Sequence, residues 1–505
     1  MAPALKPALV FIGFMAAGKS TAAREAATAL GVSADDTDAL LEAKLGEPIE
    51  AVFDRDGEAA FRAAEEQLAV TLLADADGGV IALGGGALQS AGVRAALERH
   101  VTVLVDVDLD TAWARAHGHG RPLARDRVAF EALYHARAPV YDAAANAVVP
   151  GTRTAVVRGA LGALQAIPAG HRLFWATSAS ADYPVWVGPL EAAPWPSAGR
   201  RIVISDETVA ALHGARVPEA AGHIEMPPGE EHKTLQTAEG VWHALVAQGA
   251  TRADQVIALG GGVVGDLAGF CAATYQRGMS VVQVPTTLVA QVDSAYGGKT
   301  GVDLPQAKNY VGAYHQPAAV LTDPALLQTL PPAELAAGYV EVVKTALIAG
   351  GTLWDRVAAG EGVDDAMIAG CARTKLRVVA ADERDAGARQ ALNLGHTVGH
   401  AIETTTGYGR YRHGEAVGLG LLVALRLSGQ DVLRDLVADL LTAAGLPTQL
   451  EGADPEEVVA ATARDKKRTG ESVPFVLVQG PGRVTTGHAV DAGELLSAVR
   501  ELCAS

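Results

Sequence analysis

The sequence predicts an α/β protein with three domains: one with a parallel sheet and helices on both sides, a second α/β domain, and a mostly α-helical domain. Three observations predict this fold class. Short apolar runs alternate with amphipathic stretches over about two thirds of the chain, which is typical of parallel sheets covered by helices. Glycine-rich segments follow two of these runs, at Gly13 and Gly260. After about Thr329 the strand signals fade and long helical stretches dominate.

The first domain is expected to span residues 1–165. An amphipathic segment, Glu58–Ala74, has helical character, and three apolar runs are strand-like: Val10–Ile12, Val80–Leu83 and Val101–Val105. A short Ile-Pro-Ala-Gly stretch then interrupts the pattern. Because Pro and Gly favour turns and loops, residues 166–171 are expected to form a linker.

The alternating pattern resumes over residues 172–329, the second expected domain. Its strand-like runs are Pro184–Val187, Arg201–Ile204, Val256–Leu259 and Val281–Val284. Residues 330–505 form the expected helical domain, with long helical stretches such as Glu334–Ile348. A chain of 505 residues is long enough for three cores of about 150 residues each.

Composition excludes several classes of protein. The 49% hydrophobic and 20% charged residues exclude wholesale disorder, and the net charge of −17 disfavours broad binding to nucleic acid or anionic membranes. No run reaches the roughly eighteen apolar residues of a membrane span. The apolar opening Ala8–Phe14 lacks a signal-peptide cleavage site, so we expect a buried strand there. Three distant cysteines without a CxxC pair indicate a reducing compartment, so we expect a cytoplasmic protein.

A phosphate-binding loop follows the first expected strand. Residues Gly13 to Ser20 read G-x-x-x-x-G-K-S, between an apolar run and a helical stretch. Backbone N–H groups of such a loop cradle phosphates, the Lys19 ammonium offsets their charge, and the Ser20 hydroxyl can bind Mg²⁺. The motif predicts a nucleoside triphosphate but does not identify the phosphate acceptor.

Carboxylates and arginines elsewhere in this domain suit a small anionic alcohol as acceptor. Such a reaction needs a carboxylate for Mg²⁺, another to orient the hydroxyl, and arginines for the acid and the transferred phosphoryl group. Each has a candidate in Asp36-Thr-Asp38, Arg62, Gly84–Gly86, Arg121-Pro and Arg137. Taken singly, each of these features is common in turns, caps and loops.

In this order and spacing the segment resembles the shikimate kinase family over nearly its full length. The resemblance implies that ATP is bound by Gly13, Ala16, Ala17, Gly18, Lys19, Ser20, Thr21 and Arg121. It implies that shikimate is bound by Asp38, Arg62, Gly84, Gly85, Gly86 and Arg137. Lys19, Asp38 and Arg121 would be catalytic, with Asp38 as the base for the hydroxyl. Ser20 and Asp36 would hold magnesium.

A second glycine-rich segment predicts a Rossmann-like nucleotide site. Gly260 to Gly265 reads G-x-G-x-x-G after an apolar strand, although the acidic residue expected about twenty positions later is missing. Asp206 ends another expected strand and could hold a nucleotide hydroxyl instead. Thr286 and Thr287, which carry hydroxyl groups, follow the expected strand Val281–Val284. All of these would face one crevice at the carboxyl ends of the strands.

Cationic residues downstream favour a pocket for a phosphorylated carboxylic acid. Lys299, Lys308, Lys375 and Arg389 stand in or near Gly-rich segments of an acidic chain. Solvated surface charge is the alternative for any single lysine. It suits Lys299 poorly because glycines flank this residue.

Four residues point to a metal site. His396 and His400 are one helical turn apart, so spacing alone predicts that both chelate one ion. His413 follows, and Glu341 lies on a helical stretch with Lys344 on the same face.

Here the sequence resembles the 3-dehydroquinate synthase family across residues 172–505. The resemblance implies zinc or cobalt ligands Glu341, His396 and His413. His400 would then either support the ligands from behind or transfer a proton, which overrules the chelate of His396 and His400. It implies that NAD⁺ is bound by Asp206, Glu230, Lys233, Gly261, Gly262, Val263, Asp266, Thr286, Thr287, Lys308 and Thr329. It implies that the heptulosonate phosphate is bound by Arg277, Asp293, Lys299, Asn309, Lys375, Asp385, Arg389, Lys466 and Lys467. Lys299, Lys344, His400 and Arg389 would be catalytic.

Together the two resemblances predict a bifunctional enzyme that uses ATP, Mg²⁺, NAD⁺ and Zn²⁺ or Co²⁺ on small-molecule substrates. A homo-oligomer formed through the synthase half is expected. One alternative keeps the folds but pairs a gluconate-type kinase with a metal-dependent polyol dehydrogenase. A neutral polyol would, however, leave Lys299, Lys375 and Arg389 without a partner. Another alternative is a pseudoenzyme whose kinase part only senses nucleotide. The retention of Lys19 and Asp38 disfavours it.

Overall fold

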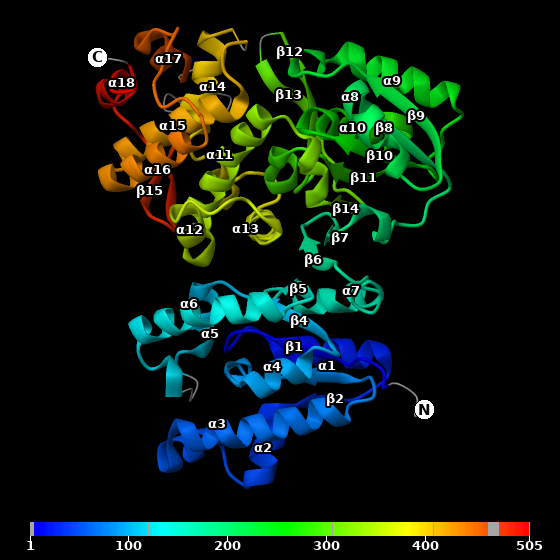
Figure 1. Ribbon diagram of the computed structural model, residues 1–505, viewed down its shortest axis with the longest axis vertical. Helices are drawn as coiled ribbons and strands as arrows, with labels where there is room; N and C mark the ends of the chain where they lie inside the picture. Colours follow the sequence, from blue (N-terminus) through cyan, green and yellow to red (C-terminus); the bar gives the residue numbers. More distant parts are fainter. Residues whose placement is uncertain (1–4, 119–121, 306, 408, 463–473, 504–505) are drawn as a thin grey trace. The chain divides into compact units, whose positions relative to one another are not determined.

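The computed structural model of the chain divides into two compact units (Figure 1). It describes residues 5–118, 122–305, 307–407, 409–462 and 474–503. The N-terminal unit comprises Met1–Ala176 and Pro184–Trp186, and the C-terminal unit comprises Thr177–Tyr183 and Val187–Ser505. Within the described ranges, no helix is both long enough and apolar enough to cross a membrane.

The N-terminal unit is built on a parallel sheet. Its first five strands lie in the order β2-β3-β1-β4-β5 and are paired in parallel throughout. These strands are β1 (Leu9–Ile12), β2 (Ala34–Asp36), β3 (Val80–Ala82), β4 (Val101–Asp106) and β5 (Ala147–Pro150). The sheet continues through β6 (Arg172–Thr177) to β7 (Asp182–Val187). β1 and β3 are fully buried, as expected for strands covered on both faces, and the three predicted strands of this unit are confirmed.

Helices separate these strands along the chain. They are α1 (Lys19–Leu30), α2 (Thr37–Leu45), α3 (Ile49–Asp75), α4 (Ala91–Leu97), α5 (Leu109–Ala116), α6 (Arg127–Ala144) and α7 (Val157–Leu164). The predicted helix Glu58–Ala74 is the second part of α3, which is broken at Gly57 by a non-helical backbone. The α/β alternation therefore follows the apolar pattern of the sequence.

In the C-terminal unit, five strands pair in parallel in the order β14-β11-β10-β8-β9. These strands are β8 (Arg201–Asp206), β9 (Ala220–Met226), β10 (Gln255–Gly260), β11 (Ser280–Pro285) and β14 (Ala319–Thr322). Helices α8 (Glu207–His213), α9 (Leu235–Ala247) and α10 (Gly262–Thr274) lie between strands in the sequence. Gly260 is in register with Pro285, and Leu259 with Ser205. The segments after β8, β10 and β11 therefore emerge at one edge of the sheet.

Helices dominate the rest of the chain, as the sequence predicts. They are α11 (Pro332–Ala349), α12 (Gly351–Ala358), α13 (Asp365–Ala381), α14 (His396–Thr405), α15 (His413–Leu427), α16 (Asp431–Ala443), α17 (Pro455–Thr462) and α18 (Ala492–Arg500). A hairpin that the sequence analysis did not single out, β15 (Phe475–Gly480) with β16 (Arg483–His488), packs among them. Another hairpin, β12 (Lys299–Leu304) with β13 (Ala307–Tyr314), packs against α10.

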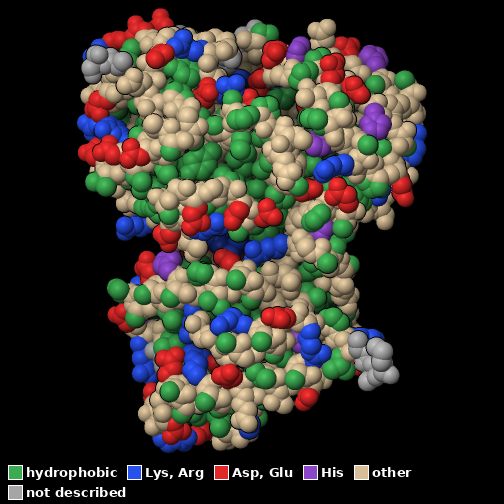
Figure 2. Space-filling model, viewed as in Figure 1, with side chains coloured by type: hydrophobic (Ala, Val, Ile, Leu, Met, Phe, Trp, Pro, Cys, Tyr) green, Lys and Arg blue, Asp and Glu red, His purple; other side chains and the backbone are tan. Residues whose placement is uncertain are grey.

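Acidic and basic side chains are interspersed on the visible face of each unit (Figure 2). This agrees with the small charged fraction and the acidic balance of the sequence. Beneath that surface, a continuous apolar core joins α11, α13, α14 and α15. The helical part therefore has a core of its own.

Helices α14 and α15 approach each other unusually closely. A Cβ atom on Gly420 would overlap the carbonyl oxygen of Gly395, and one on Gly399 would lie 3.1 Å from the Val417 Cα. Only a glycine at position 420 allows this approach. It matters for the site because α14 begins at His396 and α15 begins at His413.

We predict that Gly420→Ala lowers the free energy of unfolding of the C-terminal unit by about 1–3 kcal/mol, because the added methyl group overpacks the α14–α15 contact. The matched control is Gly240→Ala in α9, where a Cβ meets no atom within 4 Å. That change should stabilise the unit by about 0.5–1 kcal/mol through helix propensity. Urea denaturation of both variants measures the difference, and equal stabilities would contradict the packing account.

Candidate active sites

The phosphate-binding loop joins β1 to α1 in the N-terminal unit. Helix α1 begins at Lys19, and among the described residues no side chain caps its first turn. Its N–H groups can therefore receive an anion. The Lys19 ammonium donates a hydrogen bond to the Phe14 carbonyl at 3.1 Å, so the side chain folds back along the loop.

The predicted acceptor residues converge on the glycine segment after β3. A Cβ on Gly84 would lie 2.6 Å from Asp38 Oδ1, and one on Gly85 would lie 3.7 Å from Lys19 Nζ. Arg137 Nη1 donates to the Gly85 carbonyl at 3.1 Å. The phosphate loop and the expected acceptor site therefore meet at Gly85.

Arg62 is held by acidic neighbours on its own helix. Its Nη1 lies 2.6 Å from Glu65 Oε2, and its Nη2 lies 3.1 Å from Glu58 Oε1. Glu65 is 3% exposed. Burial raises the pKa of Glu65 above its usual value, although the Arg62 guanidinium opposes that rise.

Glu65 and Tyr141 also lie in this candidate site, although the sequence analysis gave neither residue a role. Glu65 stands three positions after Arg62, on the same helical face, which was the available signal. The Tyr141 hydroxyl donates to the Gly85 carbonyl at 2.5 Å, and burial raises the pKa of Tyr141 to about 12. Asp36 accepts a hydrogen bond from the Asp38 N–H at 3.1 Å as the N-cap of α2. Arg121 lies outside the described residues.

In the C-terminal unit, the second glycine segment lies at the carboxyl edge of the sheet. Gly261 is the N-cap of α10, and a Cβ on it would lie 2.9 Å from Thr287 Cγ2. The Thr286 hydroxyl is buried and has no hydrogen-bond partner among the described residues. Asp206 caps α8 by accepting from the Val209 N–H at 2.9 Å. The structure thus brings this predicted dinucleotide set to one edge.

A buried lysine pairs with two predicted dinucleotide-binding carboxylates near this edge. Lys233 is 3% exposed, and its Nζ lies 2.9 Å from Asp266 Oδ2 and 3.4 Å from Glu230 Oε1. Burial alone would lower the pKa of Lys233, but the charges of Asp266 and Glu230 raise it overall. The hydroxyl of Thr329, another predicted member of this set, lies 2.8 Å from His213 Nε2.

Next to this edge, a network of buried charges surrounds Asp293. Lys375 forms an ion pair with the Asp293 carboxylate and also donates to its carbonyl at 2.6 Å. Lys344 Nζ lies 3.6 Å from Asp293 Oδ2. Burial would raise the pKa of Asp293, but the two lysines lower it well below its usual range. Burial lowers the pKa of Lys375 to about 8 even beside this carboxylate.

Two further predicted cations occupy different environments. Arg389 is 1% exposed, and its guanidinium donates to the carbonyls of Glu383 at 2.5 Å and Gly297 at 3.2 Å. The Lys299 side chain is 47% exposed, and its Nζ lies 2.6 Å from Asp385 Oδ2. The aspartate at 385 therefore reaches this half-exposed lysine.

Arg277 and Asn309, also predicted to bind the substrate, lie after α10 and in β13, respectively. Arg277 is exposed beyond the C-terminal end of α10, so the thirteen-residue helix separates it by about 20 Å from Gly261. The Asn309 N–H donates to Asp303 Oδ1 at 2.6 Å on the β12–β13 hairpin. Lys466 and Lys467 lie outside the described residues.

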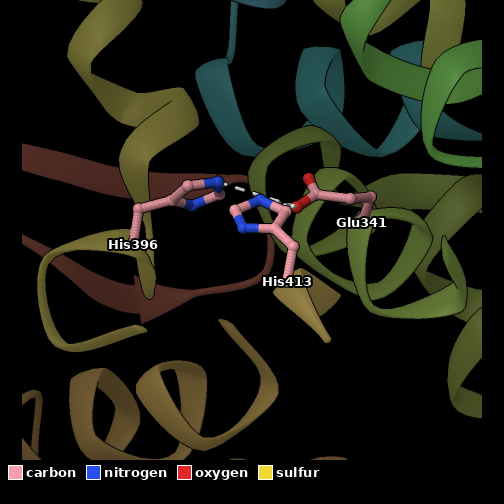
Figure 3. Close-up of side chains that lie close together, drawn as sticks. All are labelled: Glu341, His396 and His413. Atoms are coloured by element: carbon pink, nitrogen blue, oxygen red, sulfur yellow. Dashed lines mark ion pairs between the residues drawn. The ribbon is translucent and has the colours of Figure 1, made fainter. Parts of the chain in front are cut away.

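The predicted metal ligands converge on one buried carboxylate (Figure 3). Glu341 is fully buried, and its Oε1 lies 3.6 Å from His396 Nε2 and 3.8 Å from His413 Nε2. That oxygen accepts no hydrogen bond from any residue the structure describes, and Oε2 pairs with Lys344. A carboxylate oxygen with two imidazole nitrogens is a donor set that zinc prefers, so these residues fit a divalent metal.

Each imidazole has an acceptor near its other nitrogen. His396 Nδ1 lies 3.2 Å from the Leu394 carbonyl, and His413 Nδ1 lies 3.4 Å from Glu403 Oε1. This is the arrangement typical of histidines that bind a metal through Nε2. The sequence analysis did not single out Glu403.

Spacing along the helix did not identify the donor group. The rings of His396 and His400 are edge-to-face with centroids 5.4 Å apart. Among the described residues, His400 falls into a different group, with Glu403 and His413. The expectation that His396 and His400 chelate one ion is therefore not supported by the geometry.

The N-terminal unit thus has the architecture of a P-loop phosphotransferase, and the C-terminal unit that of a metal- and dinucleotide-binding α/β protein. The shikimate kinase family model matches residues 15–166, and the models of the N- and C-terminal parts of 3-dehydroquinate synthase match residues 223–337 and 338–468. The chain belongs to the 3-dehydroquinate synthase family and carries a shikimate kinase domain before the synthase part.

Curated relatives and solved structures agree with this family. The 3-dehydroquinate synthases of Halorhodospira halophila and Teredinibacter turnerae are 44% and 41% identical to the chain, over 64% of this chain and 96% of each relative. A structure of 2-deoxy-scyllo-inosose synthase with carbaglucose-6-phosphate, NAD⁺ and Co²⁺ is 26% identical, with a TM-score of 0.59. A 2-epi-5-epi-valiolone synthase from Streptomyces hygroscopicus subsp. jinggangensis with NAD⁺ and Zn²⁺ has the same identity and TM-score. Each match covers 65% of this chain and 99% of the other.

We predict that His396→Ala weakens Zn²⁺ binding by at least about 100-fold, because one of three converging donors is lost. His400→Ala is the matched control on the same helix and should retain most of the affinity. Titration of the metal-free protein with Zn²⁺, followed by calorimetry, measures both. A larger loss for His400→Ala than for His396→Ala would favour the chelate expected from spacing.

Proposed function

We propose that the chain catalyses two reactions. The first is ATP-dependent phosphorylation of shikimate to shikimate 3-phosphate. The second is NAD⁺- and metal-dependent conversion of 3-deoxy-arabino-heptulosonate 7-phosphate to 3-dehydroquinate and phosphate. The observation that carries the second assignment is the group of Glu341, His396 and His413, with its buried carboxylate, beside the lysines of the Asp293 network. We assign the kinase to residues 1–165, the linker to 166–171, the dinucleotide site to 172–329 and the metal site to 330–505.

The kinase assignment rests on the meeting of the two half-sites at Gly85. ATP phosphates would lie at the start of α1 against Lys19, with Mg²⁺ on Ser20 and Asp36. Arg62 and Arg137 would bind the shikimate carboxylate through charge-assisted hydrogen bonds. Asp38 lies beside Gly84 and Lys19 lies beside Gly85. Asp38 would accept the proton of the attacking hydroxyl.

In the synthase site, Glu341, His396 and His413 would hold Zn²⁺ or Co²⁺, and NAD⁺ would lie along Gly261, Thr286 and Thr287. When bound, the metal supplies Lewis-acid polarisation and the dinucleotide supplies reversible hydride transfer. The chain's own cations would bind the anionic substrate: Lys375 and Arg389 from inside the pocket and Lys299 from its mouth. Asp293 orients the two buried lysines, and His400 is proposed to transfer a proton.

The polyol alternative is not favoured. Lys344 and Lys375 are buried, but both ammonium groups already pair with Asp293, so their burial alone does not require an anionic substrate. The family decides instead, because the curated relatives are named 3-dehydroquinate synthases rather than polyol dehydrogenases.

Two finer assignments are also proposed. We propose a cytoplasmic protein, since Cys271 and Cys371 are buried free thiols. We propose a homo-oligomer formed through the synthase part. This is supported by the exposed position of Arg277, about 20 Å along α10 from Gly261, from which it could serve a second copy.

The two activities should be separable by single substitutions. Lys19→Ala should lower kcat/KM for shikimate phosphorylation by about 10²–10³-fold, because a phosphate-stabilising charge is lost, and should spare cyclisation. His396→Ala should do the reverse. ADP release with shikimate and phosphate release from the heptulosonate phosphate with catalytic NAD⁺ measure the two reactions.

Each substitution is the control for the other. Loss of both activities from either change would contradict two independent sites. NADH that accumulates in proportion to product would contradict the synthase reaction, since that reaction returns the hydride. ATP binding without turnover of shikimate would contradict the kinase assignment.

The KM for the heptulosonate phosphate should rise as the pH increases through about 8. The pKa of Lys375 is lowered to about 8, so its ammonium charge is present below that pH and lost above it. An anionic substrate then binds less well. Lys375→Arg, which stays charged, should flatten the profile. A wild-type KM that is constant from about pH 7 to pH 9.5 would contradict this role.

A further inference from the structure

Glu403 is a buried carboxylate that has no role in the proposed reaction described above. It lies on α14 and is 2% exposed. Its Oε1 lies 3.4 Å from His413 Nδ1 and 3.0 Å from Lys308 Nζ. Its Oε2 is also buried, without a hydrogen-bond partner among the described residues. Burying a carboxylate is costly, so these two contacts must stabilise it.

The two nitrogens of His413 face different carboxylates. Nε2 faces Glu341 at 3.8 Å, whereas Nδ1 faces Glu403 at 3.4 Å. A neutral imidazole has one N–H group and one lone pair. When Nδ1–H donates to Glu403, the lone pair is left on Nε2, on the side of Glu341 and His396.

We propose that Glu403 is a positioning residue that fixes His413 with its Nε2 lone pair directed at the metal, while the same oxygen holds Lys308. The inference rests on the proposed function, since it concerns the same metal site. Lys308 belongs to the β12–β13 hairpin, and its Nζ also lies 4.0 Å from Glu230 Oε1. One carboxylate therefore links the hairpin to a metal ligand.

A second cation bound by His400, Glu403 and His413 is the competing explanation, since one donor atom from each lies within 4.8 Å of the others. Two observations disfavour it. The rings of His400 and His413 are stacked at 29° with centroids 5.9 Å apart, so their in-plane lone pairs do not converge well. The Lys308 ammonium already neutralises Glu403 and would repel another cation.

The test is a Co²⁺ titration of the metal-free full-length chain, followed by calorimetry and by the visible absorption of bound Co²⁺. Wild type should bind one Co²⁺ in the synthase site. Glu403→Gln keeps the shape but removes the charge. It should weaken Co²⁺ binding by about 10–100-fold and alter the Co²⁺ spectrum. Glu403→Asp keeps the charge but moves it away from His413. Its Co²⁺ affinity should lie between those of wild type and Glu403→Gln.

The matched control is Glu383→Gln, which also removes a buried carboxylate from the C-terminal unit. Glu383 is 8% exposed and contacts Ser180 and Gln316, with no contact to the metal ligands among the interactions the structure describes. Its Co²⁺ affinity and spectrum should match wild type. A loss equal to that of Glu403→Gln would mean that any buried carboxylate serves, and would overturn the inference.

Other results overturn it in distinguishable ways. Wild-type affinity and spectrum in Glu403→Gln would overturn the positioning role alone. Two Co²⁺ ions in the wild-type synthase site, one of them lost in Glu403→Gln, would replace it with a second cation site. Absence of Co²⁺ binding by wild type would overturn the proposed metal site itself. If Glu403→Gln does not fold, the Co²⁺-induced rise in Tm of Glu403→Asp decides, and a rise equal to wild type overturns the inference.

Discussion

The synthase site depends on the pairing of charges that its helices bury. Glu341 is completely inaccessible, and Lys344, one turn away, contacts both this carboxylate and Asp293. A charge in such a position is tolerated only with close partners. Lys344 therefore connects Glu341, the proposed metal ligand on α11, to the Asp293 network that continues through Lys375 on α13. The same pairing that stabilises the fold thus leaves Glu341 Oε1 as an open donor for a cation.

Backbone geometry brings these charged groups together. In both units, parallel strands end at one edge, where loops and helix N-termini can approach an anionic ligand. In the helical part, close contact at Gly420 brings the start of α14 against the middle of α15, and His396 and His413 face the same carboxylate. The N-terminal unit uses glycine differently, since Gly84 and Gly85 leave room for Asp38 and Lys19.

The sequence predicted features that depend on contiguous residues, and missed those that depend on distant contacts. The phosphate loop, the alternating strands and α11 follow from local pattern. Glu403 could not be identified, because its partner Lys308 lies 95 residues earlier and the spacing of His396 and His400 suggested a different group. The position of Glu65 beside Arg62 was a local signal, but no local pattern predicts that the Glu65 side chain is buried. Lys299 was expected to be poorly suited to the surface, but its side chain is half exposed and pairs with Asp385.

The central claim is that one divalent metal binds among Glu341, His396 and His413. X-ray diffraction from crystals grown with Zn²⁺, with data collected at the zinc absorption edge, tests it most directly. The account predicts an anomalous peak about 2.0–2.2 Å from one Glu341 oxygen and from Nε2 of both histidines. A peak among His400, Glu403 and His413 instead, or a fully formed site with no peak, would contradict it.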